Sequence, residues 1–171
     1  MLKFAIKMSK ETDIEDSWYE IYAGQCKKEL FVVTSKLRIY TVSEMPSEIA
    51  ASPLHAFEMG VRASSRWIAV ELLKHPNPPT KGKMVEGVAL WTTKRAKDNY
   101  EIFLMTQKAT QGTLGVFTDT PVLYSVYGLI DTMPLNIPAG NHASKEGAIA
   151  TIIQHAAPWI AAALVAEVED E

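Results

Sequence analysis

The hydrophobic and polar positions change their period several times along the chain. From Leu2 to Met8, apolar residues alternate with lysine and alanine, which is the period of a strand with one buried face. Segments rich in aromatic and β-branched residues predict further strands at residues 18–23, 30–34, 37–42, 85–93, 100–106, 112–117 and 122–130. Several are joined by short polar turns, so we expect antiparallel pairing between neighbours. Residues 134–141 carry no such pattern and are predicted to form a loop.

Residues 52–75 have the period of a helix. Ser52 is a typical N-cap residue, and Pro53 suits the first helical position because that position needs no N–H donor. The residues predicted to pack on the sheet follow at helical spacing: Leu54, Phe57, Val61, Ser64, Ile68 and Leu72. The prolines after His75 predict the end of this helix.

A second helix is predicted over residues 144–168. Its apolar stripe consists of Ile149, Ile152, Ile153, Ala156, Ile160, Ala163 and Leu164. Pro158 removes the hydrogen bond to the Gln154 carbonyl, so we expect a kink or a break there.

The order of the predicted elements is strands, helix, strands, helix. Because the strands come in groups instead of alternating singly with helices, the sequence predicts an α+β fold. It consists of a single layer of mostly antiparallel sheet with two main helices, at about residues 52–75 and 144–168, packed on it. A length of 171 residues suits one domain covering residues 1–171, and no internal sequence repeat is visible.

The composition is that of an ordinary globular protein, with 47% hydrophobic and 22% charged residues. The most apolar stretch, residues 148–168, contains Gln154, His155, Pro158 and Glu167, which argues against a membrane span. No signal peptide precedes the first strand, and the one cysteine, Cys26, has no partner for a disulfide or a zinc site. We therefore expect a cytoplasmic protein that does not bind a membrane.

Charge is distributed unevenly along the chain. Residues 60–110 hold nine basic and four acidic side chains, whereas residues 111–171 hold one basic and seven acidic. Such a contrast suits electrostatic docking of one copy on another, or an anionic ligand at the basic segment. The surface of the second helix around Trp159, Ile160 and Ala163 is the predicted apolar anchor of a homo-oligomer, because tryptophan is frequent at interface centres.

The residues with the clearest chemical potential lie on the first helix. His55 and Glu58 are three residues apart and could act as an acid–base pair, with Arg62 and Arg66 beyond them to bind an anion. The same spacing also arises on the solvated face of any amphipathic helix. The four histidines lack the spacing of a zinc protease and no segment has the pattern of a calcium loop, so neither a metal nor a cofactor is predicted.

A second candidate site is the turn that holds Lys94, Arg95 and Lys97. Aromatic residues fall on the neighbouring strands, and aromatic rings beside cations bind single-stranded nucleic acid. The chain lacks an RNP-like signature, so nucleic-acid binding is not the favoured interpretation.

Three functional hypotheses follow. The favoured one is a non-enzymatic binding or assembly protein that acts as a homo-oligomer, and its size suits a viral or mobile-element component. The alternatives are a small cofactor-independent enzyme with a polar site on the first helix, and a nucleic-acid-binding protein that uses residues 94–97.

Overall fold

A computed structural model describes residues 1–10, 17–23, 28–34, 39–41, 50–78, 87–96, 99–106, 112–119, 124–127, 140–142 and 144–169. Within these ranges the chain forms nine strands and three helices. In chain order they are β1 (Leu2–Lys10), β2 (Ser17–Ala23), β3 (Lys28–Thr34), β4 (Ile39–Thr41), α1 (Pro53–Ala63), α2 (Ser65–Lys74), β5 (Val88–Ala96), β6 (Asn99–Thr106), β7 (Gly112–Asp119), β8 (Tyr124–Tyr127), β9 (Gly140–His142) and α3 (Lys145–Glu169).

The strands form one sheet in the order β4-β3-β2-β1-β5-β6-β7-β8-β9, and every pairing in it is antiparallel. The predicted α+β fold is therefore confirmed. The chain builds β1 to β4 outward from the middle of the sheet and then forms α1 and α2. It next builds β5 to β9 outward in the other direction and then forms α3. Both halves of the chain thus form a group of antiparallel strands followed by helical structure, although no repeat is visible in the sequence.

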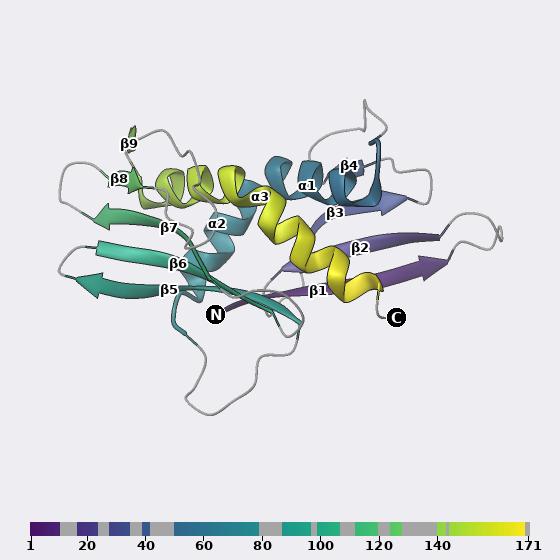
Figure 1. Ribbon diagram of the computed structural model, residues 1–171, viewed down its shortest axis with the longest axis horizontal. Helices are drawn as coiled ribbons and strands as arrows, with labels where there is room; N and C mark the ends of the chain where they lie inside the picture. The colour runs from purple at the N-terminus through teal and green to yellow at the C-terminus, as the bar shows by residue number, and fades with distance from the viewer. Residues whose placement is uncertain are drawn as a thin grey trace.

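The two groups of strands meet at a short seam between β1 and β5. Only two residue pairs define this register, Leu2 opposite Leu90 and Lys3 opposite Ala89, whereas β1 and β2 pair from Phe4–Ala23 to Lys10–Ser17. Figure 1 shows the two groups of strands extending to opposite sides of the seam, with the helices across them. Helix α3 contacts α1, α2 and strands β5 to β9, so it joins the helical layer to the second group.

Alternation along β1 separates a core-facing side from a solvent side. Leu2 and Phe4 are buried, whereas Lys3, Ala5 and Lys7 are exposed. The buried residues pack with the apolar face of α3, which includes Ile149, Ile152, Ile153, Ala156, Ile160 and Leu164. The strand predicted from Leu2 to Met8 is therefore present, and one of its faces carries the core.

The predicted first helix is divided into α1 and α2 at Ser64. The Ser64 N–H donates to the carbonyls of Gly60 and Val61 at 3.0 and 3.2 Å, and its buried hydroxyl donates to the Leu30 carbonyl at 3.3 Å. A serine hydroxyl competes for backbone partners in this way, which favours a break at a helix junction.

Most of the predicted apolar stripe of this segment is correct. Phe57, Val61, Ile68 and Leu72 are buried, but Leu54 is 45% exposed. Leu54 lies in the first turn of α1. The periodicity of the sequence predicts which side of a helix is buried, but it does not indicate how far along the helix the core extends.

Helix α1 approaches the sheet closely at Gly60. A Cβ atom at this position would collide with the ring of Phe31 on β3. The same ring meets Phe57 edge-on, with centroids 6.0 Å apart and planes at 84°. Glycine at position 60 therefore lets the helix backbone rest on an aromatic ring that is itself fixed in the core.

Helix α3 is continuous through Pro158, and Figure 1 shows its axis changing direction along its length. Length and hydropathy alone would allow this helix to cross a membrane, but 56% of its most apolar window is buried inside the protein. A central core helix has the same composition, so this is weak evidence for a membrane span.

The short strand β9, at residues 140–142, lies where the sequence predicted a loop. Three residues carry too little pattern to predict a strand.

The amino group of Met1 holds the start of β1 against the end of α2. It donates to the carbonyls of His75 and Asn77, both at 2.6 Å. Partial burial lowers the pKa of this amine from its ordinary value.

Candidate functional site

Of the four polar residues predicted on the first helix, Glu58 and Arg62 pair with each other, and Arg66 pairs with a residue of α3. Arg62 contacts Glu58 on α1 at 2.9 Å, with the two side chains 51% and 23% exposed. Arg66, which is 83% exposed, reaches across to Glu146 at the start of α3, at 3.0 Å. The structure therefore brings Glu58 and Arg62 together but gives Arg66 a different carboxylate. Exposed ion pairs of this kind contribute little to stability.

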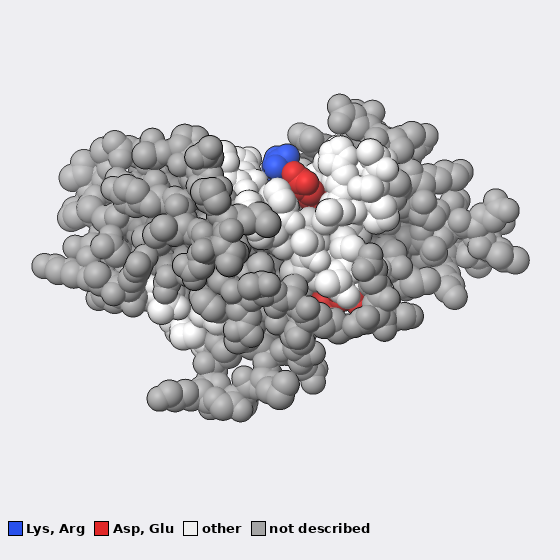
Figure 2. Space-filling view, in the orientation of Figure 1, with Lys and Arg blue, Asp and Glu red and all other residues white. Residues whose placement is uncertain are grey.

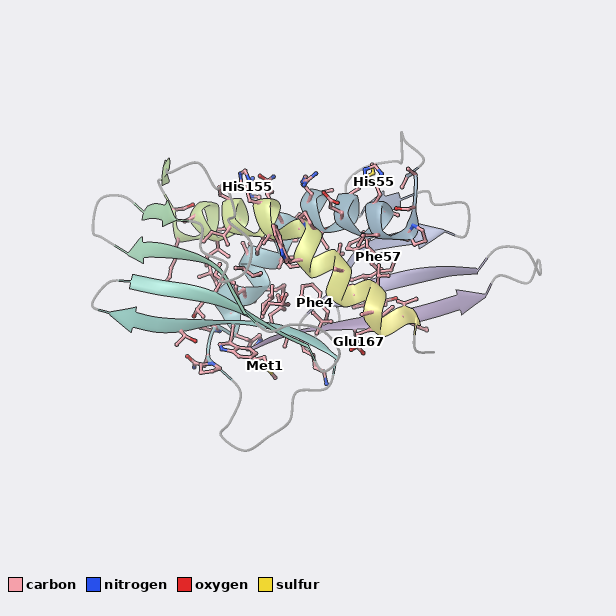
Figure 3. All side chains as sticks on the ribbon, in the orientation of Figure 1. Met1, Phe4, His55, Phe57, His155 and Glu167 are labelled. Atoms are coloured by element: carbon pink, nitrogen blue, oxygen red, sulfur yellow. The ribbon has the colours of Figure 1, made fainter. Side chains whose placement is uncertain are left out.

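His55 lies at the beginning of α1, three residues before Glu58. Its Nδ1 atom accepts a hydrogen bond from the Ala51 N–H at 3.4 Å. The backbone N–H of His55 donates to the Ser52 hydroxyl at 3.1 Å, so the predicted N-cap residue Ser52 is confirmed. Figure 3 shows His55 on the side of α1 that points away from the sheet. A catalytic role for His55, Glu58, Arg62 and Arg66 stays a prediction.

Strands β5 and β6 pair antiparallel as expected, but β5 extends to Ala96, so Lys94 and Arg95 lie in the strand and not in the predicted turn. Lys94 lies opposite Tyr100, Ala96 lies opposite Asn99, and the register shifts between these two pairs. Lys94 and Arg95 belong to the last residues of β5, while Lys97 lies outside the described residues. Nucleic-acid binding at this turn stays a prediction.

Trp159 on α3 is half-buried and packs against the main core. Its predicted neighbours in an interface, Ile160 and Ala163, are fully buried inside the chain, so that part of the prediction is wrong. The helical period explains the error, because Ile160 and Ala163 continue the stripe that faces the sheet, whereas Ala162 is exposed.

The described surface of the helices carries both charged and apolar side chains, and Arg62, Arg66 and Lys74 are exposed on it. On the face drawn in Figure 2, a basic patch lies against an acidic one, with uncharged atoms beside them among the described residues. Two large apolar side chains of the helices are exposed, Leu54 at 45% and Trp67 at 41%. We call the solvent-exposed side chains of α1 to α3, among them Leu54, Trp67, Trp159 and Ala162, the outer helical surface.

A pocket of about 130 Å³ lies where the last turns of α3 meet β1 and the start of β5. Its apolar walls are Phe4, Ile6, Val88, Leu164 and Val168. Gly87, which has φ of 77°, completes the rim, and Glu167 supplies the carboxylate among the lining residues. Figure 3 shows Phe4 and Glu167 near the C-terminal end of α3.

The Oε1 atom of Glu167 is buried, and no hydrogen-bond partner contacts it in the described structure. Buried carboxylate oxygens normally accept at least one hydrogen bond, because leaving one unpaired is costly. The sequence interpretation treated Glu167 only as a charge in an apolar stretch. A better signal was its spacing, because it lies three residues after Leu164 and so continues the buried stripe of α3.

The part of the chain that the structure describes holds no group of three or more His, Cys, Asp and Glu residues placed to bind a metal ion. Comparison of the chain with protein-family models, with curated proteins and with solved structures finds no match.

Proposed function

We propose that the protein is a non-enzymatic binding and assembly protein that acts as a homo-oligomer, docking through its outer helical surface. The observation that carries this proposal is the exposure of two large apolar side chains on the helices, Leu54 and Trp67. Helices at the surface of a soluble protein ordinarily present charged residues to water. Large exposed apolar side chains favour contact with another protein where they lie together.

A second copy of the chain is the partner that this surface fits. Glu58 and Arg62 already neutralise each other, so two copies of the same surface can approach without like-charge repulsion. A two-fold contact places the same surface on both sides, which gives a closed dimer. Apolar burial then supplies most of the free energy of association, with Trp159 and Leu54 as the large contributors.

The uneven charge of the chain has a smaller part in this assembly. Arg66 of the basic segment and Glu146 of the acidic segment are paired within one chain, at 3.0 Å. This pair therefore neutralises one basic and one acidic residue within the chain, and these two charges contribute less to contact between copies. The remaining contrast supports the rate and the register of docking more than its strength.

The pairing of the polar residues on α1 and α2 supports a non-enzymatic role. A general base needs a reacting group within hydrogen-bond reach, and nucleophilic sites gather such groups in a pocket. His55, Glu58, Arg62 and Arg66 instead lie on the surface, and three of them take part in ion pairs or hydrogen bonds within their own segment.

Replacing Leu54 with glutamate tests the proposed surface. The side chain is exposed, and a carboxylate in the first turn of a helix is favourable, so we expect the fold to be retained. Self-association should weaken by about tenfold or more, because a charge would then be buried in the interface. Sedimentation velocity over a range of concentrations measures this change.

The matched control is Ala5→Glu, which adds the same side chain at an exposed position of β1 on the other side of the sheet. It should leave association unchanged. Equal association constants for wild type and Leu54→Glu would show that the outer helical surface is not the interface.

A further inference from the structure

The pocket beside Glu167 has properties that self-association does not use. It lies within one chain, and its walls come from β1, β5 and α3. Among the described residues, the Oε1 atom of Glu167 has no hydrogen-bond donor, and the other lining residues of the pocket are apolar side chains and one glycine. A ligand that supplies this donor would remove the cost of the unpaired oxygen.

The electrostatics at this end of α3 favour a cation. Glu167 lies in the last turn of a helix that ends at Glu169, where the helix dipole is negative, and no basic residue occupies that turn. Lys3 and Lys7 on β1 alternate with the pocket residues Phe4 and Ile6, so they lie on the opposite face of the sheet and are exposed. Lys3 and Lys7 therefore point away from this carboxylate.

The size and the walls of the pocket restrict the cation. A volume of about 130 Å³ resembles the cavity of roughly 150 Å³ that accepts a benzene molecule in another protein. The apolar side chains suit a short alkyl chain, and the single carboxylate suits one charged group at its end. A primary ammonium group has three donors and stays protonated at neutral pH.

We infer that this pocket binds a primary alkylammonium group, with the alkyl chain against Phe4, Leu164 and Val168 and the ammonium on Glu167. The group is either a free amine or the side chain of a lysine on another protein, since both present the same atoms. The inference does not rest on self-association, because one chain forms the complete pocket.

Titration of the full-length protein with n-butylammonium, followed by amide NMR shifts of the α3 residues near Glu167, tests this inference. We expect saturable binding with a Kd in the range of about 1–10 mM, as is reasonable for a ligand of five heavy atoms. The neutral 1-butanol and the anionic butyrate have the same alkyl length and should bind at least about tenfold more weakly. Equal shifts from butanol, or no saturation by about 100 mM amine, would overturn the inference.

Glu167→Gln separates a binding carboxylate from a structural one. This variant keeps the shape of the side chain and removes its charge, so amine affinity should fall about tenfold or more. Without amine, its Tm should equal or exceed that of wild type, because a partly buried charge without a partner among the described residues is gone. Unchanged amine affinity in Glu167→Gln would contradict the inference, as would a marked loss of Tm.

Glu146→Gln is the matched control, because Glu146 lies at the other end of α3 and pairs with Arg66 on the surface. Its amine affinity should match that of wild type. A titration with Nα-acetyl-lysine N-methylamide then distinguishes the two sources. Affinity comparable to that of butylammonium indicates a lysine side chain, and binding of butylammonium alone indicates a free amine. The oligomeric mass of the same samples shows whether the assembly proposal fails separately.

Discussion

At the scale of single residues, the contact between Gly60 and Phe31 fixes how closely α1 lies on the sheet. The Phe31 ring is fully buried and held from another side by Phe57, so it has little freedom to move away from a new methyl group. The helical backbone and the aromatic ring therefore meet at a distance that only glycine allows.

Gly60→Ala should consequently destabilise the protein, although alanine is the better helix former by about 1 kcal/mol. We expect a net loss of about 1–3 kcal/mol, because overpacking a rigid core outweighs the gain in helix propensity. Chemical denaturation measures the free energy of unfolding. Combining the change with Phe31→Leu should recover part of the loss, and a stabilised Gly60→Ala single variant would show that α1 does not rest on this ring.

A second residue-scale feature is the buried carboxylate of Glu71 on α2. Its side chain is only 7% exposed and accepts a hydrogen bond from Lys74, which is 58% exposed, at 3.0 Å. The sequence interpretation did not single out either residue, because a Glu and a Lys three residues apart usually form a solvated pair.

Lys74→Met removes the cation and leaves the Glu71 carboxylate buried. We expect a loss of about 1–2 kcal/mol, less than for a fully buried pair because Lys74 is largely solvated. The double variant Glu71→Leu with Lys74→Met should be close to wild type in stability. Additive losses in this double-mutant cycle would mean that the two side chains do not stabilise each other.

At the scale of elements, the apolar stripe of α1 and α2 is the feature that the sequence predicted best. Val61→Asp would place an uncompensated charge where the native side chain is fully buried. The expected cost is about 3–5 kcal/mol, visible as a large fall in Tm or as loss of soluble protein. Ala63→Asp adds the same group at an exposed position of α1 and should change stability little. A Val61→Asp variant with the wild-type Tm would show that the stripe is misplaced.

The elements that the sequence missed share a physical cause. The break at Ser64 depends on its hydroxyl reaching Leu30 on a distant strand, and β9 depends on pairing with β8. Neither contact is local, so neither leaves a period in the sequence. Strand β1 and helix α3 were predicted because each has one long face that must be buried.

The candidate sites were harder to predict for a similar reason. His55, Glu58 and Arg62 stand close in sequence, but the structure spreads their contacts over the N-cap and a surface ion pair. The pocket at Glu167 combines residues from β1, β5 and α3, which only the sheet order brings together. A site assembled from distant elements has no sequence spacing to reveal it.

At the scale of the whole molecule, two groups of strands with similar topology share a short seam and a common layer of helices. Helix α3 belongs to the second group in sequence but packs on α1 and α2, which follow the first. Its inner side is therefore committed to the core, and only its outer side remains for contact with another copy. We propose that self-association uses this outer helical surface.

The mass of the particle in solution tests this claim most directly. Static light scattering at micromolar concentration should give a multiple of the 18.9 kDa chain mass. The mass should change little between about 50 and 500 mM salt, because apolar contacts are not screened. Dissociation at high salt would indicate that the copies are held together by the segregated charges and not by the apolar surface. A mass of one chain at all salt concentrations would contradict the proposed assembly.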